Sequence, residues 1–299
     1  MQPSSWHITG NRDSNTGHTA SGMRLPSDWR MTMKQAIKTF YDPATFTLTY
    51  VVYDEDSRDA VVIDPVLDYN PIGSIVSDES FQQVVDFVAE NDLKLHYVLE
   101  THAHADHLSS SQLFRDEYPD IKVAISERIT GVQTVFKTVY NLDESFVTDG
   151  NQFDTLITDF EILEAGTLRI KALPTPGHTP ACLSFLIGDA VFTGDALFMP
   201  DYGTGRCDFP AGDARTLYRC VTDNLYSLPD ETRVFVGHDY QPGGRDVAWE
   251  STIGEEKATN IQLKADTSED DFVTFREQRD SGLAAPKLIY QSILVNIDA

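Results

Sequence analysis

The pattern of hydrophobic and polar positions changes near residue 36. Residues 1–35 are dominated by Ser, Thr, Gly, Asn and charged side chains and have no periodic apolar pattern. Such a stretch buries too little apolar surface to offset the entropy lost on ordering. We therefore predict a flexible N-terminal segment over 1–35 and a single folded domain over 36–299 that includes a short helical tail.

Two runs of β-branched and aromatic residues open the folded region. Residues 47–53 and 60–64 are separated by a polar stretch rich in Asp, which predicts a β-hairpin. Apolar residues then recur at helical spacing over 81–88, with Ser80 as a candidate N-cap. The apolar run 95–99 predicts the next strand.

Strand and helix patterns alternate along most of the remaining chain. The stretch 141–160 is an exception, because it is acidic and rich in loop residues. Predicted strands cover 121–125, 168–173, 182–187, 190–193 and 234–236, and predicted helices cover 108–117, 128–138, 214–228, 255–264 and 269–281, before a tail at 285–296. Alternation of this kind is typical of a layered α/β fold.

Histidines are concentrated in loops that follow predicted strands. The segment 101–107 places three imidazoles and a carboxylate between a predicted strand and a predicted helix. Three other strands end in a glycine followed by a candidate ligand, at Gly177-His178, Gly194-Asp195 and Gly237-His238. Of the 8 histidines in the chain, five lie in these four segments: His102, His104, His107, His178 and His238.

These residue types indicate a metal centre. Imidazole nitrogen and carboxylate oxygen suit zinc, iron and manganese alike. Loops at the ends of neighbouring strands can point to one centre, and a glycine beside each ligand permits a tight turn. A single loop histidine is usually structural, but the four segments together favour metal binding. His96 lies on a strand instead, and we assign it a structural role.

Charge and cysteine content narrow the class of protein. The chain has 23 Lys and Arg residues against 47 Asp and Glu residues, a formal net charge of −24. This acidity disfavours binding to nucleic acid or to an anionic membrane. The three cysteines form no disulfide framework, and no apolar run reaches the length of a transmembrane helix. We therefore expect a cytoplasmic protein that acts on small molecules, and the sequence leaves a homodimer open.

The order His-x-His-x-Asp-His, Gly-His, Gly-Asp and Gly-His resembles that of the metallo-β-lactamase superfamily. The resemblance covers about 36–299. It implies an α/β fold, the αββα four-layer sandwich, with metal held between two sheets. It also implies ligands for one metal at His102, His104, His178 and Asp195, and for a second metal at Asp106, His107, Asp195 and His238.

The sequence around these ligands is similar to that of persulfide dioxygenases. The similar stretches are 101–107, 205–209, Asp239-Tyr240 and the tail 286–296. Members of that family use non-haem iron to oxidise glutathione persulfide with O2, giving sulfite and glutathione. Because zinc has no redox chemistry, activation of oxygen favours iron. The resemblance implies one Fe(II) per chain held by His102, His178 and Asp195, with His104, Asp106, His107 and His238 as further ligands or as residues that tune the metal.

Catalytic and substrate roles are expected for a few further side chains. Asp106 and His107 would orient ligands or hold water, and Tyr240 could donate a hydrogen bond to substrate or oxygen, although a packed ring fits the same position. Arg206 is the candidate for the anionic end of the substrate, because an acidic chain repels an anionic thiol. A surface ion pair is the alternative for Arg206. Cys207 stands where the family commonly has threonine, and its role is left open.

Two other functions fit the same residues. A thioester hydrolase of the glyoxalase II kind would use a dinuclear zinc or zinc and iron site to bind the hydroxide that attacks hydroxyacylglutathione. A non-catalytic, sulfide- or redox-responsive protein would keep the metal for stability alone. Against the hydrolase, the C-terminal residues are more similar to the dioxygenase tail than to the larger glutathione-binding region of those hydrolases. Similarity to β-lactamases is limited to the shared metal motifs.

Overall fold

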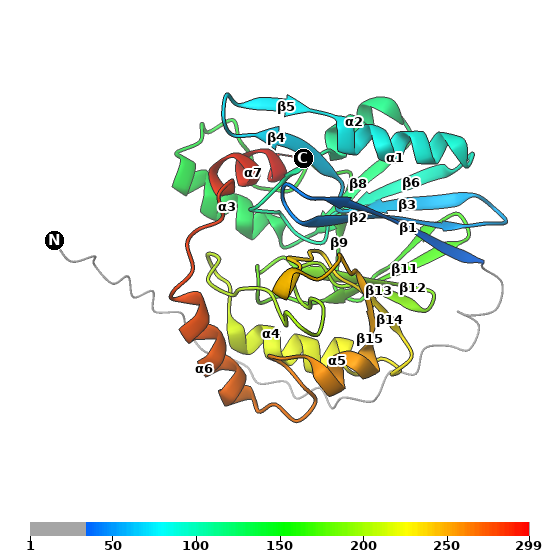
Figure 1. Ribbon diagram of the computed structural model, residues 1–299. Helices are drawn as coiled ribbons and strands as arrows, with labels where there is room; N and C mark the ends of the chain where they lie inside the picture. Colours follow the sequence, from blue (N-terminus) through cyan, green and yellow to red (C-terminus); the bar gives the residue numbers. More distant parts are fainter. Residues whose placement is uncertain (1–33, 299) are drawn as a thin grey trace.

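The structure, a computed structural model, describes residues 34–298. The predicted flexible segment 1–35 lies outside the described residues except for its last two positions, and Gln35 already begins the first strand. Two six-stranded sheets are stacked face to face, with helices on the outside of each (Figure 1). The expected αββα four-layer sandwich is therefore confirmed.

The first sheet is mixed, with the strand order β1-β2-β3-β6-β8-β9. Neighbours from β1 to β3 are antiparallel, and neighbours from β3 to β9 are parallel. Its strands are β1 Gln35–Asp42, β2 Thr47–Asp54, β3 Asp59–Ile63, β6 Lys94–Leu99, β8 Lys122–Ser126 and β9 Thr155–Ile157.

The second sheet has the order β10-β11-β12-β13-β14-β15, and all its neighbours are antiparallel except the parallel pair β13 and β14. A small third sheet has the order β5-β4-β7. The strands of these two sheets are β10 Ile162–Ala165, β11 Leu168–Pro174, β12 Leu183–Ile187, β13 Ala190–Phe192, β14 Arg233–Phe235, β15 Glu250–Thr252, β4 Val66–Asn70, β5 Ile75–Ser77 and β7 Leu108–Ser109.

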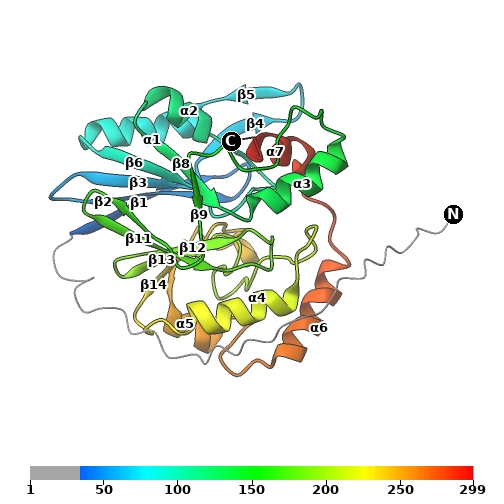
Figure 2. The same ribbon diagram turned by 180° about the vertical axis from the view of Figure 1, so that it is seen from behind.

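Helices α1, α2, α3 and α7 lie on the outer side of the first sheet, and α4, α5 and α6 lie on the outer side of the second (Figures 1 and 2). Helix α4 continues directly into a π-helical turn, η2, and a short 3-10 turn is labelled η3. No helix within residues 34–298 is both long enough and apolar enough to cross a membrane. The helices are α1 Glu79–Glu90, α2 Ser111–Glu117, α3 Ile129–Tyr140, α4 Ala214–Cys220, η2 Val221–Leu225, η3 Pro242–Gly244, α5 Ile253–Thr259, α6 Glu269–Asp280 and α7 Ile289–Asn296.

Alternation along the central strands builds two hydrophobic cores. On β2, Leu48, Tyr50 and Val52 belong to the core between the sheets, whereas Val51 belongs to the core beneath the helices. Strand β3 repeats the pattern on its two faces. Because these strands are buried on both sides, their sequences are almost continuously apolar, and they were predicted correctly. The rigid sheets then hold the loops at their edges in place.

Two predicted helix starts are wrong, and β4 accounts for both. Leu108, predicted to begin a helix, lies in the short strand β7 opposite Leu67 of β4, and α2 begins only at Ser111. Ser80, predicted as a cap, lies within the first turn of α1, where its N–H and hydroxyl donate to Asp68 of β4. Strand β4 was not predicted, so neither contact could be foreseen.

The strands that the sequence pattern missed lie mainly at sheet edges. Strand β9 falls within the stretch 141–160 that was interpreted as loop, and β1, β10 and β15 are the other edges of the two large sheets. Edge strands face solvent along one side, so their apolar pattern is weak. The predicted helix 214–228 also differs, since α-helical geometry ends at Cys220 and the π-helical turn ends at Leu225.

Candidate metal centre

Four loops deliver the candidate ligands to one place. The loop 101–107 follows β6, and His178 follows β11. Asp195 follows β13, and His238 follows β14. The first loop belongs to the first sheet and the other three to the second, so the centre lies at the junction of the two stacked sheets.

The candidate ligands form two adjacent sets. In the first set, His102, His178 and Asp195 place one ligand atom each within 4.8 Å of one another. In the second set, four residues also place one ligand atom each within 4.8 Å of one another. This set comprises His104, Asp106, His107 and His238.

Asp195 connects the two sets through its two carboxylate oxygens. Its Oδ2 lies 3.5 Å from Nε2 of His178, in the first set. Its Oδ1 lies 3.3 Å from Nε2 of His238, which is also 3.3 Å from Oδ2 of Asp106 in the second set. The geometry therefore accommodates either one metal in the first set or two metals that share Asp195.

Backbone carbonyl groups fix the orientation of two imidazoles. Nδ1 of His178 donates to the carbonyl of Arg206 at 2.6 Å, and Nδ1 of His107 donates to the carbonyl of Leu108 at 3.1 Å. A ring nitrogen that donates to a carbonyl carries the proton, so Nε2 keeps its lone pair. Each lone pair is thereby available to a metal.

Threonine hydroxyl groups contact Nδ1 of two further candidate ligands, His102 and His238. Nδ1 of His102 lies 3.0 Å from Oγ1 of Thr101, and Nδ1 of His238 lies 3.4 Å from Oγ1 of Thr47. In both residues the opposite nitrogen, Nε2, is left for the ligand position.

Buried atoms without hydrogen-bond partners indicate whether the site fits a metal ion. Nε2 of His102, Nδ1 of His104, Nε2 of His107 and Oδ1 of Asp195 are all buried and accept or donate no hydrogen bond. Such atoms destabilise a folded protein unless another group satisfies them. Lone pairs on nitrogen and carboxylate oxygen are the donors that iron and zinc bind. The residues present therefore fit a metal ion.

His104 is held from behind by two carboxylates that the sequence did not reveal. Its Nε2 lies 3.1 Å from Oδ1 of Asp64 and 3.3 Å from Oε2 of Glu100. Burial lowers the pKa of His104, but the two carboxylates outweigh burial and raise that pKa well above its ordinary value. The only sequence signal was position, since Asp64 ends a predicted strand and Glu100 precedes the histidine loop.

Burial keeps the remaining imidazoles of the loop neutral. It lowers the pKa of His102 well below the ordinary value, with a further contribution from the neighbouring histidines. It also lowers the pKa of His107 to about 3. Neutral imidazole is the form that binds metal, so these two side chains need not lose a proton first.

Glycine is required at two positions where the ligand loops pack closely against each other. Gly194 has φ +49°, and a Cβ atom there would lie 2.5 Å from Oγ1 of Thr101. A Cβ atom at Gly205 would lie 2.0 Å from the carbonyl oxygen of Asp195. A side chain at either glycine would push the ligand loops apart.

Tyr240 lies at the edge of the second set. Its ring stacks on His238, with the centroids 5.6 Å apart and the planes at 18°, and it also packs on Tyr202. Burial raises the pKa of Tyr240 well above its ordinary value, and Asp106 and Asp195 add to the effect. Tyr240 is therefore a packed ring whose hydroxyl stays protonated next to the centre.

Arg206 is not a free cation. Its guanidinium makes two bonds of 2.6 Å to the carboxylate of Asp208 and donates to the carbonyl of Ala284 at 2.8 Å. This arrangement matches the ion-pair alternative, and the substrate role stays a prediction. The backbone of Arg206 has a separate function, because its carbonyl accepts the bond from His178.

Residues outside the two sets have other partners. Cys207 is buried, burial raises the pKa of its thiol, and its N–H donates to Asp280, so it offers no reactive thiolate. His96 lies away from the centre, where its Nε2 is 2.8 Å from Oδ1 of Asp59. The structural role expected for His96 agrees with that contact.

A cavity approaches the second set from the surface. It has a volume of about 190 Å³ and reaches His107. The turn between β1 and β2 forms one wall, and the hairpin of β4 and β5 forms another. The cavity thus lies between these two hairpins, beside His107 of the second set.

An αββα sandwich with two histidine and carboxylate sets at the junction of its sheets defines a class of metal-binding proteins. The chain belongs to the metallo-β-lactamase superfamily, whose family model matches residues 42–238. The matched region contains both ligand sets, and the C-terminal helices lie beyond it.

The relatives of this chain are named for different activities. The chain is 42% identical to a probable metallo-hydrolase of Burkholderia pseudomallei, over 88% of this chain and 92% of the relative. It is 41% identical to glyoxylase B2 of Dictyostelium discoideum, over 90% and 92%. It is 33% identical to the mitochondrial persulfide dioxygenase ETHE1 of Bos taurus, over 81% and 82%. The crystal structure of ETHE1 from Myxococcus xanthus matches with a TM-score of 0.69 and 33% identity, over 88% of this chain and 98% of that chain.

Proposed function

We propose that the protein is a non-haem iron persulfide dioxygenase that binds one Fe(II) per chain through His102, His178 and Asp195. The observation that carries the proposal is the convergence of two buried imidazoles and one carboxylate within 4.8 Å. Two histidines and one carboxylate on one face of an iron ion are typical of oxygen-activating enzymes, because they leave positions for both substrate and oxygen.

The proposed reaction consumes one glutathione persulfide, one O2 and one water. It yields one glutathione, one sulfite and two protons, so the outer sulfur is oxidised and the S–S bond is broken. Bound iron would supply the activation of oxygen, which zinc cannot supply.

The protein's own groups prepare the substrates. The hydroxyl of Tyr240, kept protonated by burial, donates a hydrogen bond to the persulfide or to oxygen. Asp106 and His107 hold water and orient the ligands beside it. Arg206 attracts the anionic end of glutathione once that group competes with Asp208 for the guanidinium.

The alternative is a thioester hydrolase of the glyoxalase II type with zinc or a zinc and iron pair. A specific observation favours it, because the second set is also complete and Asp195 contacts both sets. The names of two relatives, a probable metallo-hydrolase and a glyoxylase, point the same way, whereas the ETHE1 relatives support the dioxygenase.

Metal analysis combined with two assays distinguishes these functions. We expect about one iron per chain, O2 uptake with glutathione persulfide and equimolar sulfite. The same preparation should leave S-lactoylglutathione unchanged. Two metals per chain with thioester hydrolysis and no O2 uptake would contradict the dioxygenase. Metal binding without either activity would instead favour the non-catalytic role.

We also propose that residues 36–299 form a single domain in a cytoplasmic enzyme of small molecules. Three free cysteines fit a reducing compartment. The net charge of −24 argues against nucleic acid and anionic membranes as partners.

A further inference from the structure

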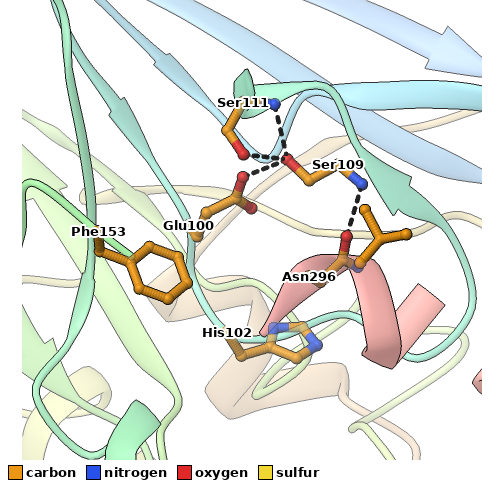
Figure 3. A pocket seen from close by; sticks show the side chains of 7 residues that line it. Glu100, His102, Ser109, Ser111, Phe153 and Asn296 are labelled. Carbon is orange, nitrogen blue, oxygen red and sulfur yellow. Dashed lines mark hydrogen bonds between the residues drawn. The ribbon is translucent and has the colours of Figure 1, made fainter. Parts of the chain in front are cut away.

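Asn296, at the end of α7, contacts the histidine loop from the far end of the chain. Its Oδ1 accepts a hydrogen bond from the N–H of Ser109 at 2.8 Å. Its Nδ2 donates to the carbonyl of His104 at 2.9 Å and to the carbonyl of His107 at 2.8 Å. One amide thus binds both sides of the segment that carries three ligands of the second set. Figure 3 shows Asn296 beside Ser109 and His102.

The contact uses the full capacity of the asparagine side chain. Asn296 is 6% exposed, both its amide hydrogens are donated, and its oxygen accepts. The carbonyl groups of a tight loop cannot pair within a sheet or helix, and unpaired buried carbonyls are costly. A side chain with two donors and one acceptor in a plane satisfies this loop, and an aliphatic side chain of similar size would not.

A second path runs from Asn296 to the side chain of His104. The hydroxyl of Ser109 donates to Oε1 of Glu100 and lies 2.9 Å from the hydroxyl of Ser111 (Figure 3). Oε2 of Glu100 in turn lies 3.3 Å from Nε2 of His104. Asn296 therefore acts on the backbone of His104 directly and on its ring through Ser109 and Glu100.

Helix α7 is itself firmly attached. Ile293 and Ile297 are fully buried in the core beneath the helices. From α3, Nε2 of Gln133 donates to the carbonyl of Ile297 at 2.8 Å, and the hydroxyl of Tyr140 donates to the carbonyl of Ile289 at 3.0 Å. Figures 1 and 2 both place α7 beside α3. The asparagine is thus mounted on packed helices.

We propose that Asn296 is a positioning residue that sets the geometry of the metal ligands His104 and His107. It lies beyond the region that the family model matches, on a helix that contacts the backbone of the histidine loop. The proposal rests on metal binding by the second set, as in the alternative with two metals, and its test follows metal binding rather than either reaction.

The test measures metal binding by the full chain, without turnover. Co(II) serves as the probe, because its visible absorption reports the coordination of the ion, and competition with a chelator gives its Kd. Replacing Asn296 with alanine should raise the Kd about 10- to 100-fold, the usual effect of removing a group that orients a ligand, and should alter the Co(II) spectrum.

The variant Asn296→Asp keeps the shape of the side chain but removes the two hydrogen bonds that the side chain donates. An aspartate still accepts from the N–H of Ser109, but it places a carboxylate against the carbonyls of His104 and His107. We therefore expect a Kd raised at least as much as in Asn296→Ala. A wild-type Kd and spectrum in Asn296→Asp would overturn the proposal. Should the alanine variant fail to fold, the aspartate variant and Asn296→Ser carry the same comparison.

Two variants on the same helix serve as controls. Ile293→Val removes a buried methyl group and should lower Tm while leaving the Kd for Co(II) within twofold of the wild type. Gln291→Ala changes an exposed side chain and should alter neither quantity. If Ile293→Val weakens Co(II) binding as much as Asn296→Ala does, Asn296 contributes only to helix packing and the proposal is wrong.

Discussion

At the scale of single residues, His104 illustrates how the centre is built. One ring nitrogen faces two carboxylates, and the other faces the ligand set without a protein partner. A histidine oriented by a carboxylate is a better metal ligand, because its ring cannot rotate and its free nitrogen is more basic. Asp64 therefore affects metal binding although it belongs to neither ligand set.

Replacing Asp64 with asparagine should weaken Zn(II) binding by about 10- to 100-fold, because the amide keeps the size of the side chain but loses the charge that balances His104. Competition with a chromophoric chelator measures the Kd. Asp59→Asn is the matched control, since it breaks a similar contact to His96 outside the centre and should leave the Kd unchanged. Equal effects of the two substitutions would refute this role of Asp64.

At the scale of elements, helix α5 carries a carboxyl group that the centre does not use. Glu256 is fully buried, where it accepts hydrogen bonds from Ser251 and Asn260. Burial raises its pKa to about 8 from an ordinary 4.5. The folded protein therefore holds this proton at neutral pH, whereas the unfolded chain releases it.

The free energy of unfolding should accordingly fall as the pH rises from about 4.5 to about 8, because only the folded state keeps the proton of Glu256 over that range. Below about pH 4.5 the carboxyl group is protonated in both the folded and the unfolded state, so it does not affect how the free energy of unfolding changes with pH. Glu256→Gln removes the ionisation, so its Tm relative to the wild type should be higher at pH 8 than at pH 5. Thermal unfolding of both proteins at the two pH values tests this, and parallel pH profiles would contradict it.

Elements buried on both faces could be predicted from the sequence, and those set by a distant partner could not. Strands β2, β3 and β12 are buried along almost their whole length and have dense apolar runs, and their predicted positions are confirmed. Strand β7 is two residues long and exists because β4 pairs with it. The same distinction holds in the centre. Histidine-rich loops were evident in the sequence, but Asp64, Glu100 and Asn296 are recognised only from their contacts.

At the scale of the whole molecule, the C-terminal helices support the centre from two directions. Helix α7 holds the histidine loop through Asn296. Helix α6 holds the segment 204–207, because Arg276 donates to the carbonyl of Thr204 at 3.0 Å and Asp280 accepts from the N–H of Cys207 at 2.8 Å. That segment includes the carbonyl that orients His178.

Arg276→Met should destabilise the protein by about 3–5 kcal/mol, because it leaves Asp280 buried and charged without its partner. Urea unfolding at neutral pH measures the change, provided that the slope with denaturant is unchanged. Adding Asp280→Asn to the same variant should recover part of the loss, since the uncompensated charge is then removed. A loss below about 1 kcal/mol in the single variant would show that the buried pair adds little to stability.

The shared carboxylate of Asp195 has a consequence for how the protein acquires metal. Because one oxygen faces His178 and the other faces His238, an ion entering either set draws on the same side chain. When a second ion binds, the carboxylate of Asp195 would already contact the first ion, and its orientation would already be fixed. Successive ions therefore cannot bind independently, and a metal titration that loads two ions should not fit a model of two equal, independent sites.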